Sequence, residues 1–202
     1  DALQNEGKTA IIICTNKEVE GVIGLLDEVR PESKEVVEQI KDYGVNPVMQ
    51  TGDNLISAQA IAKMIGISEV KAGLLPEEKA KEIQILLSKY GSVGMVGDGI
   101  NDAPALALSS VGITMSELGS DTAIEASSIV ILSDYLKKIP FLINLGRKAL
   151  TTIRMNISIA ILIKLLFISL AMFGMSNLAL AIFADVGVTV MVILNSLRLS
   201  KV

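Results

Sequence analysis

Two long apolar stretches constrain the fold of this chain more than any other feature of its sequence. Residues 157–173 and 178–194 are almost wholly apolar, and each is about 17 residues long, near the lower limit for a membrane-spanning helix. An uncharged turn joins them, and Arg and Lys residues flank both outer ends. Because cationic flanks stay in the cytoplasm, the pattern predicts a membrane hairpin with the globular part of the chain on that side. The alternative is a hairpin buried in a larger soluble core, which the about 140 preceding residues are too few to provide.

Each apolar stretch carries one charged residue near its middle, Lys164 in the first and Asp185 in the second. Ionisable residues inside a membrane are functional candidates by default, because burying each costs at least a few kcal/mol. Counted from the turn, the two residues differ in depth by about 3 Å, so an ion pair is feasible. A purely structural ion pair that holds the hairpin together is the alternative interpretation.

Composition excludes several kinds of chemistry. The net charge is −4, aromatic residues make up 3% and Trp is absent, which argues against a nucleic-acid partner. With no His and one Cys, Cys14, the chain forms neither an internal disulfide nor a zinc cluster. Cys14 lies in an apolar run and is expected to be a small buried side chain. Any chemistry must therefore use Asp, Glu, Lys, Ser and Thr.

Before the hairpin, short apolar strands alternate with helical segments, which predicts βαβ units and a parallel sheet. Strands are expected at 8–13, 21–26, 45–50, near 70, 92–96, 111–114 and 129–132, and helices at 31–43, 55–65, 76–90 and 135–154. Two polar clusters fall at the carboxyl ends of strands, where such sheets bind ligands.

The polar cluster around residue 98 is the more informative of the two. An apolar run delivers Asp98 to the end of a strand, and Gly97 and Gly99 permit a sharp turn and the close approach of a ligand. Asp102 follows four residues later, and Pro104 suits the first turn of a helix. Two carboxylates at this edge fit a hard cation such as Mg²⁺. Alternatively, the segment is a surface turn whose residues only shape the loop.

The second cluster, Thr51-Gly52-Asp53, and the helix residue Lys79 supply complementary groups. A hydroxyl, a backbone N–H, an ammonium and a carboxylate-bound cation would together neutralise a phosphoryl group. Taken singly, Thr-Gly-Asp is a common turn, and Lys79 could be a solvated lysine paired with Glu77 or Glu82.

In this order and spacing, the motifs resemble the haloacid-dehalogenase core of P-type cation ATPases. The matching segments are Thr51-Gly52-Asp53-Asn54, Pro76-x-x-Lys79, Gly97-Asp98-Gly99-x-Asn101-Asp102-x-Pro104, Asp27-x-x-Arg30-Pro31 and Gly119-Ser120-Asp121 with Glu125. The resemblance implies a Rossmannoid parallel-sheet domain followed by the membrane hairpin.

The resemblance also implies roles for individual residues. Asp98 would hold a catalytic Mg²⁺, with Asn101 and Asp102 ordering its ligand shell. Lys79 would contact the phosphoryl group. Thr51 and Gly52 would bind the phosphoryl oxygens, and Asp53 belongs to the same catalytic motif. Asp27 and Arg30 would bind the cofactor near the joint of the phosphorylation and nucleotide domains.

The hairpin resembles the last two helices of the zinc/cadmium/lead-exporting class of these pumps. The segments that match are Asn156, Lys164, Asp185-x-Gly187 and Asn195-Ser196-Leu197-Arg198-Leu199. The resemblance implies that Asp185 is a ligand of the transported metal and that Lys164 is its counter-charge.

One departure from the family limits what this chain does alone. The family phosphorylates an aspartate in Asp-Lys-Thr-Gly-Thr, a motif that is absent here. We therefore expect the carboxyl-terminal part of an ATP-driven export pump, inactive by itself.

Expected domain boundaries are 1–22 for the tail of the nucleotide-binding domain, 23–134 for the phosphorylation domain and 135–202 for a stalk helix and two membrane helices. Expected cofactors are Mg²⁺ and ATP, the latter bound mainly by an upstream domain. Expected partners are the lipid of the cell membrane, a divalent metal ion and the rest of the pump.

Two other functions remain open from the sequence. One is a truncated, inactive membrane protein that acts as a partner or a metal buffer. The other is a membrane-tethered phosphatase of the dehalogenase fold, which would need an Asp-x-Asp nucleophile that no apolar strand here provides.

Overall fold

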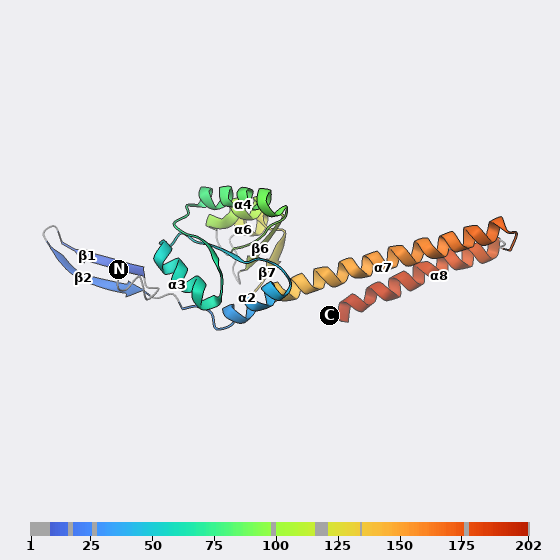
Figure 1. Cartoon of the computed structure of the whole chain (residues 1–202), viewed down its shortest axis with the longest axis horizontal. Coiled ribbons are helices and arrows are strands. Elements are labelled where there is room, and N and C mark those ends of the chain that lie inside the picture. The colour runs from blue at the N-terminus through green and yellow to red at the C-terminus, as the bar shows by residue number, and fades with distance from the viewer. Residues whose placement is uncertain are drawn as a thin grey trace. The chain divides into compact units, whose positions relative to one another are not determined.

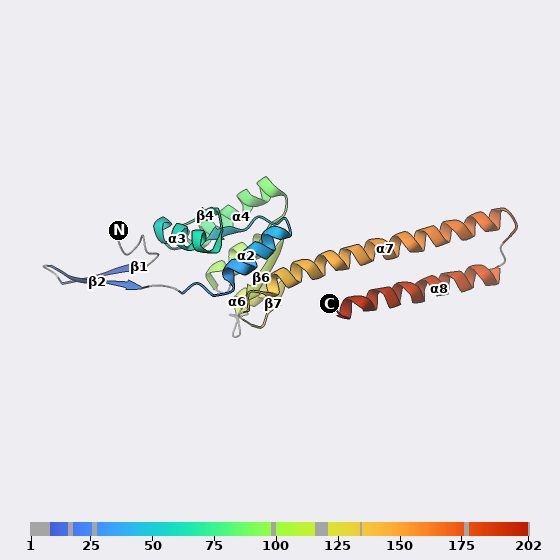
Figure 2. The same cartoon turned by 60° about the horizontal axis from the view of Figure 1, so that its bottom comes forward.

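A computed structural model describes residues 9–15, 18–25, 28–97, 100–115, 121–133, 135–175 and 178–201. The chain divides into two compact units, with the boundary after Lys138. The first contains the strands and short helices, and the second is a pair of long helices that lie side by side in both views (Figures 1 and 2). The expected fold, a parallel-sheet α/β domain followed by a helical hairpin, is confirmed.

The α/β unit contains two parallel sheets. One pairs β3 (Val48–Gln50) with β4 (Glu69–Lys71), and the other has the order β5 (Gly94–Gly97), β6 (Val111–Met115), β7 (Ile129–Ile131). The register places Gly97 beside Thr114 and Met115 beside Ile131. Strand β3 begins at Val48 rather than at the expected Val45, because Pro47 has no N–H to donate to a ladder.

An antiparallel hairpin, β1 (Thr9–Cys14) and β2 (Val19–Leu25), precedes these sheets. Its apolar side chains are accessible, including those of Ile11, Ile12 and Ile13. Cys14 is exposed as well, so the expectation that it is buried is wrong. The reason is that a two-stranded ribbon has no second layer against which to bury its side chains.

The helices of the α/β unit are α2 (Ser33–Asp42), α3 (Leu55–Ile65), α4 (Pro76–Tyr90), the 3₁₀ turn η1 (Ile100–Asp102), α5 (Ala103–Leu108) and α6 (Asp121–Ala126). Capping residues mark the ends of two of them, α3 and α4. At the start of α3, the Ser57 N–H donates to the Asn54 side chain at 3.0 Å. Gly66, with φ +84°, ends it in the left-handed conformation. Pro76 occupies the first turn of α4, where its missing N–H is harmless.

A small core holds α4 and α5 against the three-stranded sheet. Its buried members are Ile83, Met95, Ala105 and Leu106. The approach is close: a Cβ on Gly112 of β6 would lie 2.7 Å from the Leu106 carbonyl oxygen. This packing fixes the first turn of α4 and the turn η1, the two elements that carry Lys79 and Asp102.

The second unit consists of α7 (Lys138–Met172), α8 (Leu178–Leu197) and the 3₁₀ turn η2 (Arg198–Lys201). The apolar windows of Lys138–Met172 and Ile182–Ser200 have hydropathies of 2.2 and 1.7, and both helices are long and apolar enough to cross a membrane. Only 6% of each window is buried, unlike the core helix of a soluble protein. The expected amphipathic segment and first apolar stretch form one continuous helix, which begins at Lys138 rather than at Tyr135.

Candidate functional site

The polar loop after β3 holds its shape through its own hydrogen bonds. The Thr51 hydroxyl donates to the Asp53 carboxylate at 2.9 Å, and the Asp53 N–H donates to Thr51 Oγ1 at 3.1 Å. Backbone bonds tie it to the segment after β4: the Gly73 N–H donates to the Asp53 carbonyl at 2.7 Å, and the Leu74 N–H to the Thr51 carbonyl at 3.1 Å. The loop is therefore preformed at the carboxyl end of β3.

Gly52, at the tip of this loop, is exposed and not crowded by the protein. A Cβ at this position would meet only the Leu74 carbonyl oxygen, at an ordinary contact distance of 3.5 Å. Its φ is not among the positive values of the described glycines. Neither packing nor backbone conformation demands glycine here, whereas the close approach of a ligand to the backbone would.

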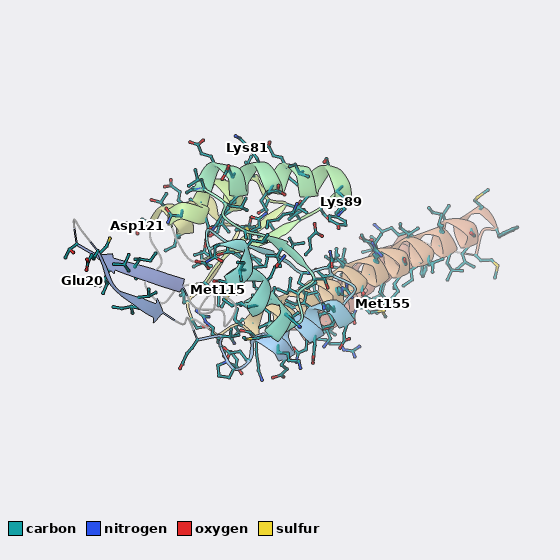
Figure 3. All side chains as sticks on the ribbon, turned by 60° about the vertical axis from the view of Figure 1, so that its left-hand side comes forward. Glu20, Lys81, Lys89, Met115, Asp121 and Met155 are labelled. Atoms are coloured by element: carbon teal, nitrogen blue, oxygen red, sulfur yellow. The ribbon has the colours of Figure 1, made fainter. Side chains whose placement is uncertain are left out.

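Lys79 and Asp102 form a tight ion pair between the first turn of α4 and η1. Lys79 Nζ lies 2.8 Å from Asp102 Oδ1, and the side chains are only 15% and 13% exposed. Lys79 is thus not paired with Glu82, which instead contacts Lys71 at 3.3 Å. Lys81, further along α4, points outward into solvent (Figure 3). Its burial and its partner on another element distinguish Lys79 from an ordinary solvated helix lysine.

Asp102 also lies against the last residue of β5. A Cβ on Gly97 would be 2.8 Å from the Asp102 Cβ and 2.9 Å from its Oδ2. Glycine at 97 is therefore required by the position of the Asp102 carboxylate. Sequence reasoning attributed this glycine to a sharp turn and a nearby ligand, and missed the contact with Asp102.

The expected Mg²⁺ ligand Asp98 lies outside the described residues, together with Gly99. Within the described ranges, no group of three or more His, Cys, Asp or Glu side chains is placed to hold a metal ion. The Asp102 carboxylate is a hard oxygen donor at the carboxyl end of β5, the donor chemistry that Mg²⁺ prefers. Its Oδ1 is occupied by Lys79, which leaves Oδ2 as the oxygen that fits such an ion.

The other expected site residues of the α/β unit are less closely defined. Asn101 is exposed in η1, and Arg30 is half-buried just before α2. Asp121 and Glu125 are exposed on α6. The remaining members of these motifs lie outside the described residues; they are Asp27, Gly119 and Ser120.

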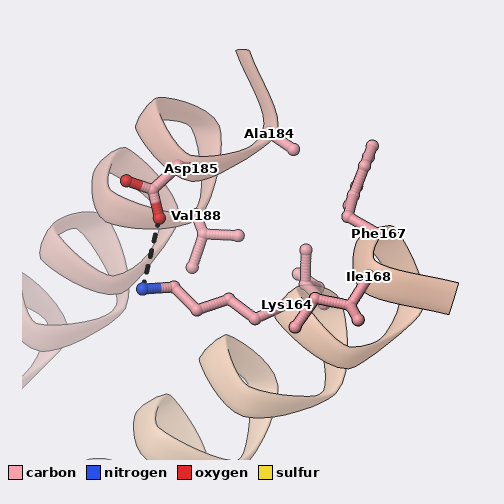
Figure 4. Close-up of a pocket in the computed structure, with 7 residues that line it drawn as sticks. Lys164, Phe167, Ile168, Ala184, Asp185 and Val188 are labelled. Atoms are coloured by element: carbon pink, nitrogen blue, oxygen red, sulfur yellow. Dashed lines mark ion pairs between the residues drawn. The ribbon is translucent and has the colours of Figure 1, made fainter. Parts of the chain in front are cut away.

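In the helical hairpin, Lys164 of α7 and Asp185 of α8 form an ion pair. Lys164 Nζ lies 3.3 Å from Asp185 Oδ1, so the pair that the matched depths allowed is present (Figure 4). The side chains are 65% and 64% exposed, so two helices alone do not enclose them. The Thr189 hydroxyl bonds to the Asp185 carbonyl at 3.0 Å and leaves the carboxylate to Lys164.

The ion pair borders an open pocket of about 270 Å³ on the hairpin. Its lining residues, five of them apolar, are Ile163, Lys164, Phe167, Ile168, Ala184, Asp185 and Val188. The lining is mostly apolar, so Lys164 and Asp185 are the charged groups that the pocket offers to an ion. Gly187, two residues after Asp185, faces open space, since a Cβ there would meet nothing within 4 Å.

A second polar contact joins the two helices, and sequence reasoning gave its residues no structural role. The Asn195 side-chain amide donates to Asn156 Oδ1 at 2.7 Å, and the Asn156 amide donates to Ser196 Oγ at 3.0 Å. The Ser196 hydroxyl in turn donates to the Val192 carbonyl at 2.9 Å. We call Asn156, Asn195 and Ser196 the amide clamp.

Comparison with known proteins identifies the family to which the chain is similar. Residues 1–109 match the family model described as haloacid dehalogenase-like hydrolase. A probable cadmium-transporting ATPase of Alkalihalophilus pseudofirmus is 47% identical over 99% of this chain, and a zinc/cadmium/lead-transporting P-type ATPase of Escherichia coli is 40% identical over 98%. The crystal structure of a zinc-transporting PIB-type ATPase in the E2.Pi state matches 98% of the chain with a TM-score of 0.87 and 39% identity.

These relatives confirm the resemblance that the motifs indicated, to P-type ATPases that transport heavy metals. The chain spans 28% and 27% of the two curated relatives and 32% of the crystallised one. Together with the two apolar helices, the likeness to these ATPases supports an integral membrane protein.

Proposed function

We propose that this chain, which belongs to the haloacid dehalogenase-like hydrolase family, is part of an ATP-driven pump that exports divalent heavy-metal ions through an aspartyl-phosphate intermediate. The chain would supply two parts of that pump. The α/β unit would handle the phosphoryl group, and the hairpin would form part of the path of the metal.

The observation that carries the proposal is the Lys164–Asp185 pair on an open pocket of two helices of membrane-spanning length. A carboxylate at this depth is unfavourable unless a cation meets it. Lys164 provides that cation at 3.3 Å when no metal is present. A divalent ion that enters the pocket would displace the ammonium, and the ammonium would compete for the same carboxylate when the ion leaves.

In the α/β unit, the side chains supply the kinds of group that phosphoryl transfer requires. Lys79 would contact the phosphoryl group, while the loop of Thr51, Gly52 and Asp53 would bind its oxygens through the hydroxyl and backbone N–H groups. The Thr51 hydroxyl must first turn from Asp53, to which it now donates at 2.9 Å. Asp102 would hold Lys79 in position, and their ion pair would open when the phosphoryl group binds.

Mg²⁺ and ATP are the proposed cofactors. When bound, Mg²⁺ would screen the phosphoryl charge. Asp98 and Asp102 would hold it, with Asn101 ordering the ligand shell. Asp27 and Arg30 would lie on the nucleotide side. ATP would be bound mainly by the rest of the pump. The rest of the pump would also provide the aspartate that is phosphorylated, because this sequence contains no Asp-Lys-Thr-Gly-Thr motif.

We assign residues 1–22 to the tail of the nucleotide-binding domain, 23–134 to the phosphorylation domain and 135–202 to the stalk and membrane helices. Basic residues at both outer ends of the hairpin, among them Arg154 and Arg198, support a cytoplasmic location for the α/β unit at the cell membrane.

The first test uses this chain alone. In lipid with Mg²⁺, Zn²⁺ and ATP, it should acquire no acid-stable covalent phosphate, because the nucleophile motif is absent. Acid-stable label that maps to a residue of this chain would contradict the proposed division of roles and favour a phosphatase-like enzyme with its own nucleophile.

The second test uses the full-length protein that contains this chain. Asp185→Ala should lose metal binding within the membrane and metal-stimulated ATP hydrolysis, while the protein still folds. Asp98→Asn is the matched control: it should lose phosphorylation and keep stoichiometric metal binding. If Asp185→Ala binds Zn²⁺ with unchanged stoichiometry and affinity, the carboxylate is not a ligand and the ion pair is purely structural.

A further inference from the structure

The amide clamp is the other polar contact that the described residues make across the hairpin. Its hydrogen bonds run in one direction, from the Asn195 amide to Asn156, from Asn156 to Ser196, and from the Ser196 hydroxyl to a backbone carbonyl of α8. Asn156 therefore both accepts and donates across the hairpin. Polar groups in an apolar setting need such partners, and interhelical bonds of this kind hold membrane helices together.

The clamp and the ion pair lie on the same seam between the helices. Asn156 and Lys164 are eight residues apart on α7, and Asn195 and Asp185 are ten apart on α8, offsets of about 12 and 15 Å along the axes. At 3.6 residues per turn, each spacing rotates the side chain by about 80° around its helix, so the two contacts lie within one broad face of each helix. Among the described residues from 151 to 200, Asn156 and Val188 are the buried ones, at 8% and 7% exposure. One register of α7 against α8 thus satisfies both contacts.

We propose that Asn156 is a positioning residue, which fixes the register of α7 against α8 through Asn195 and Ser196 and so keeps Lys164 opposite Asp185. The ion pair alone fixes the register less closely, because the long, flexible Lys164 side chain can reach the carboxylate from more than one register, whereas the short Asn156 side chain cannot reach its partners in that way. The clamp shares no residue with the ion pair. The register does not rest on the proposed function; only the exchange of Lys164 for a metal does.

The test measures the distance between the helices in the full chain in lipid nanodiscs. Cys14→Ser removes the single cysteine of the chain. Spin labels are then attached to cysteines introduced at two accessible positions, Leu162 on α7 and Met191 on α8. We expect one narrow distance distribution for the native seam. Asn156→Leu should broaden it or shift it by up to about 5 Å, one helical turn. Lys164→Met should leave it unchanged.

Three further variants keep the result interpretable. Asn156→Asp keeps the acceptor for the Asn195 amide and can accept from Ser196, so it should retain the native distance. Ser196→Ala removes one bond and should give a smaller shift than Asn156→Leu. Ser169→Ala is the matched control, because that hydroxyl bonds within α7, to the Leu165 carbonyl at 2.7 Å. Circular dichroism checks that each variant retains its helices.

An unchanged distribution in folded Asn156→Leu would overturn the proposal, as would an equal shift in Lys164→Met. Should Asn156→Leu fail to insert, the graded comparison of Ser196→Ala with Asn156→Asp and Ser169→Ala decides the question. A separate Zn²⁺ titration of the native chain reports on metal binding. If the native chain binds no Zn²⁺, that result counts against the proposed function and leaves the result on the helix register intact.

Discussion

The two units of this protein contain the same ion pair in opposite surroundings. Lys79 and Asp102 lie 2.8 Å apart, with about one-seventh of each side chain exposed, on elements fixed by a packed core. Lys164 and Asp185 lie 3.3 Å apart, with about two-thirds of each exposed, on helices that bury few of their own residues. By distance and exposure alone, the first pair would be judged the stronger.

The surroundings decide what must replace a partner when each pair opens. The Lys79–Asp102 pair is largely buried, so it opens without a large cost only when another charged group takes the place of one partner. If the hairpin crosses a membrane, the accessible surface of Lys164 and Asp185 is not exposed to water, and separating them without another partner is costly. The pair in the α/β unit is thus suited to open for a phosphoryl group, and the pair in the hairpin to open only when a cation replaces the lysine.

The largest expected effect is that of Lys79→Ala in the full-length protein. Removal of the ammonium takes away a charge aimed at the phosphoryl group, so phosphoryl transfer should slow on the order of 10²–10³-fold. Lys81→Ala, on the exposed side of the same helix, should keep nearly normal turnover. The rate of phosphoenzyme formation measures both. Equal effects of the two substitutions would show that Lys79 acts through general charge and not through its position.

A smaller effect is expected from Gly97→Ala, which displaces Asp102 without removing a charge. The new Cβ would lie 2.8 Å from the Asp102 Cβ, so the carboxylate must move and the ion pair with Lys79 must lengthen. We expect about 1–3 kcal/mol of destabilisation, measured by denaturant unfolding of the full chain, since overpacking costs this much. An alanine variant as stable as the native chain would mean that Asp102 can relocate freely.

Much of the fold was predictable because local signals and tertiary packing agree. The ends of α3 follow from Asn54 and Gly66, and the start of α4 from Pro76. Parallel pairing follows from the alternation of strands and helices. The charges at mid-depth of the hairpin, Lys164 and Asp185, follow from counting residues, since helix rise is constant.

The features that could not be predicted depend on contacts between residues far apart in sequence. Lys79 has three glutamates near it on its own helix, yet its partner is Asp102, placed there by the packing of α4 on α5. An apolar run around Cys14 indicates burial, but the run forms a two-stranded ribbon without a covering layer. Asn156 was noticeable in the sequence, whereas its bonds to α8 depend on the register of two helices.

The hairpin pair gives the next prediction. Lys164→Ala in the full-length protein should retain stoichiometric Zn²⁺ binding, because Asp185 remains, but should release the metal about tenfold more slowly, a change of about 1.4 kcal/mol. Lys164→Arg keeps the positive charge and should slow metal release less than Lys164→Ala does. Stopped-flow measurement of metal release from the purified variants separates them. Faster release from the alanine variant would mean that Lys164 holds the metal site together and does not compete with the metal.

The smallest expected change is in the stability of Gly52→Ala, and its value lies in separating packing from ligand binding. A Cβ at position 52 meets only the Leu74 carbonyl at 3.5 Å, so the free energy of unfolding should change by less than about 0.5 kcal/mol. The same methyl group would occupy the open space beside the backbone that we assign to the phosphoryl oxygens. Phosphoenzyme formation in the full-length protein should therefore fall severalfold while unfolding is unaffected. If both quantities stay unchanged, the loop after β3 does not approach the phosphoryl group closely. If both fall together, residue 52 has a structural role that its open surroundings do not indicate.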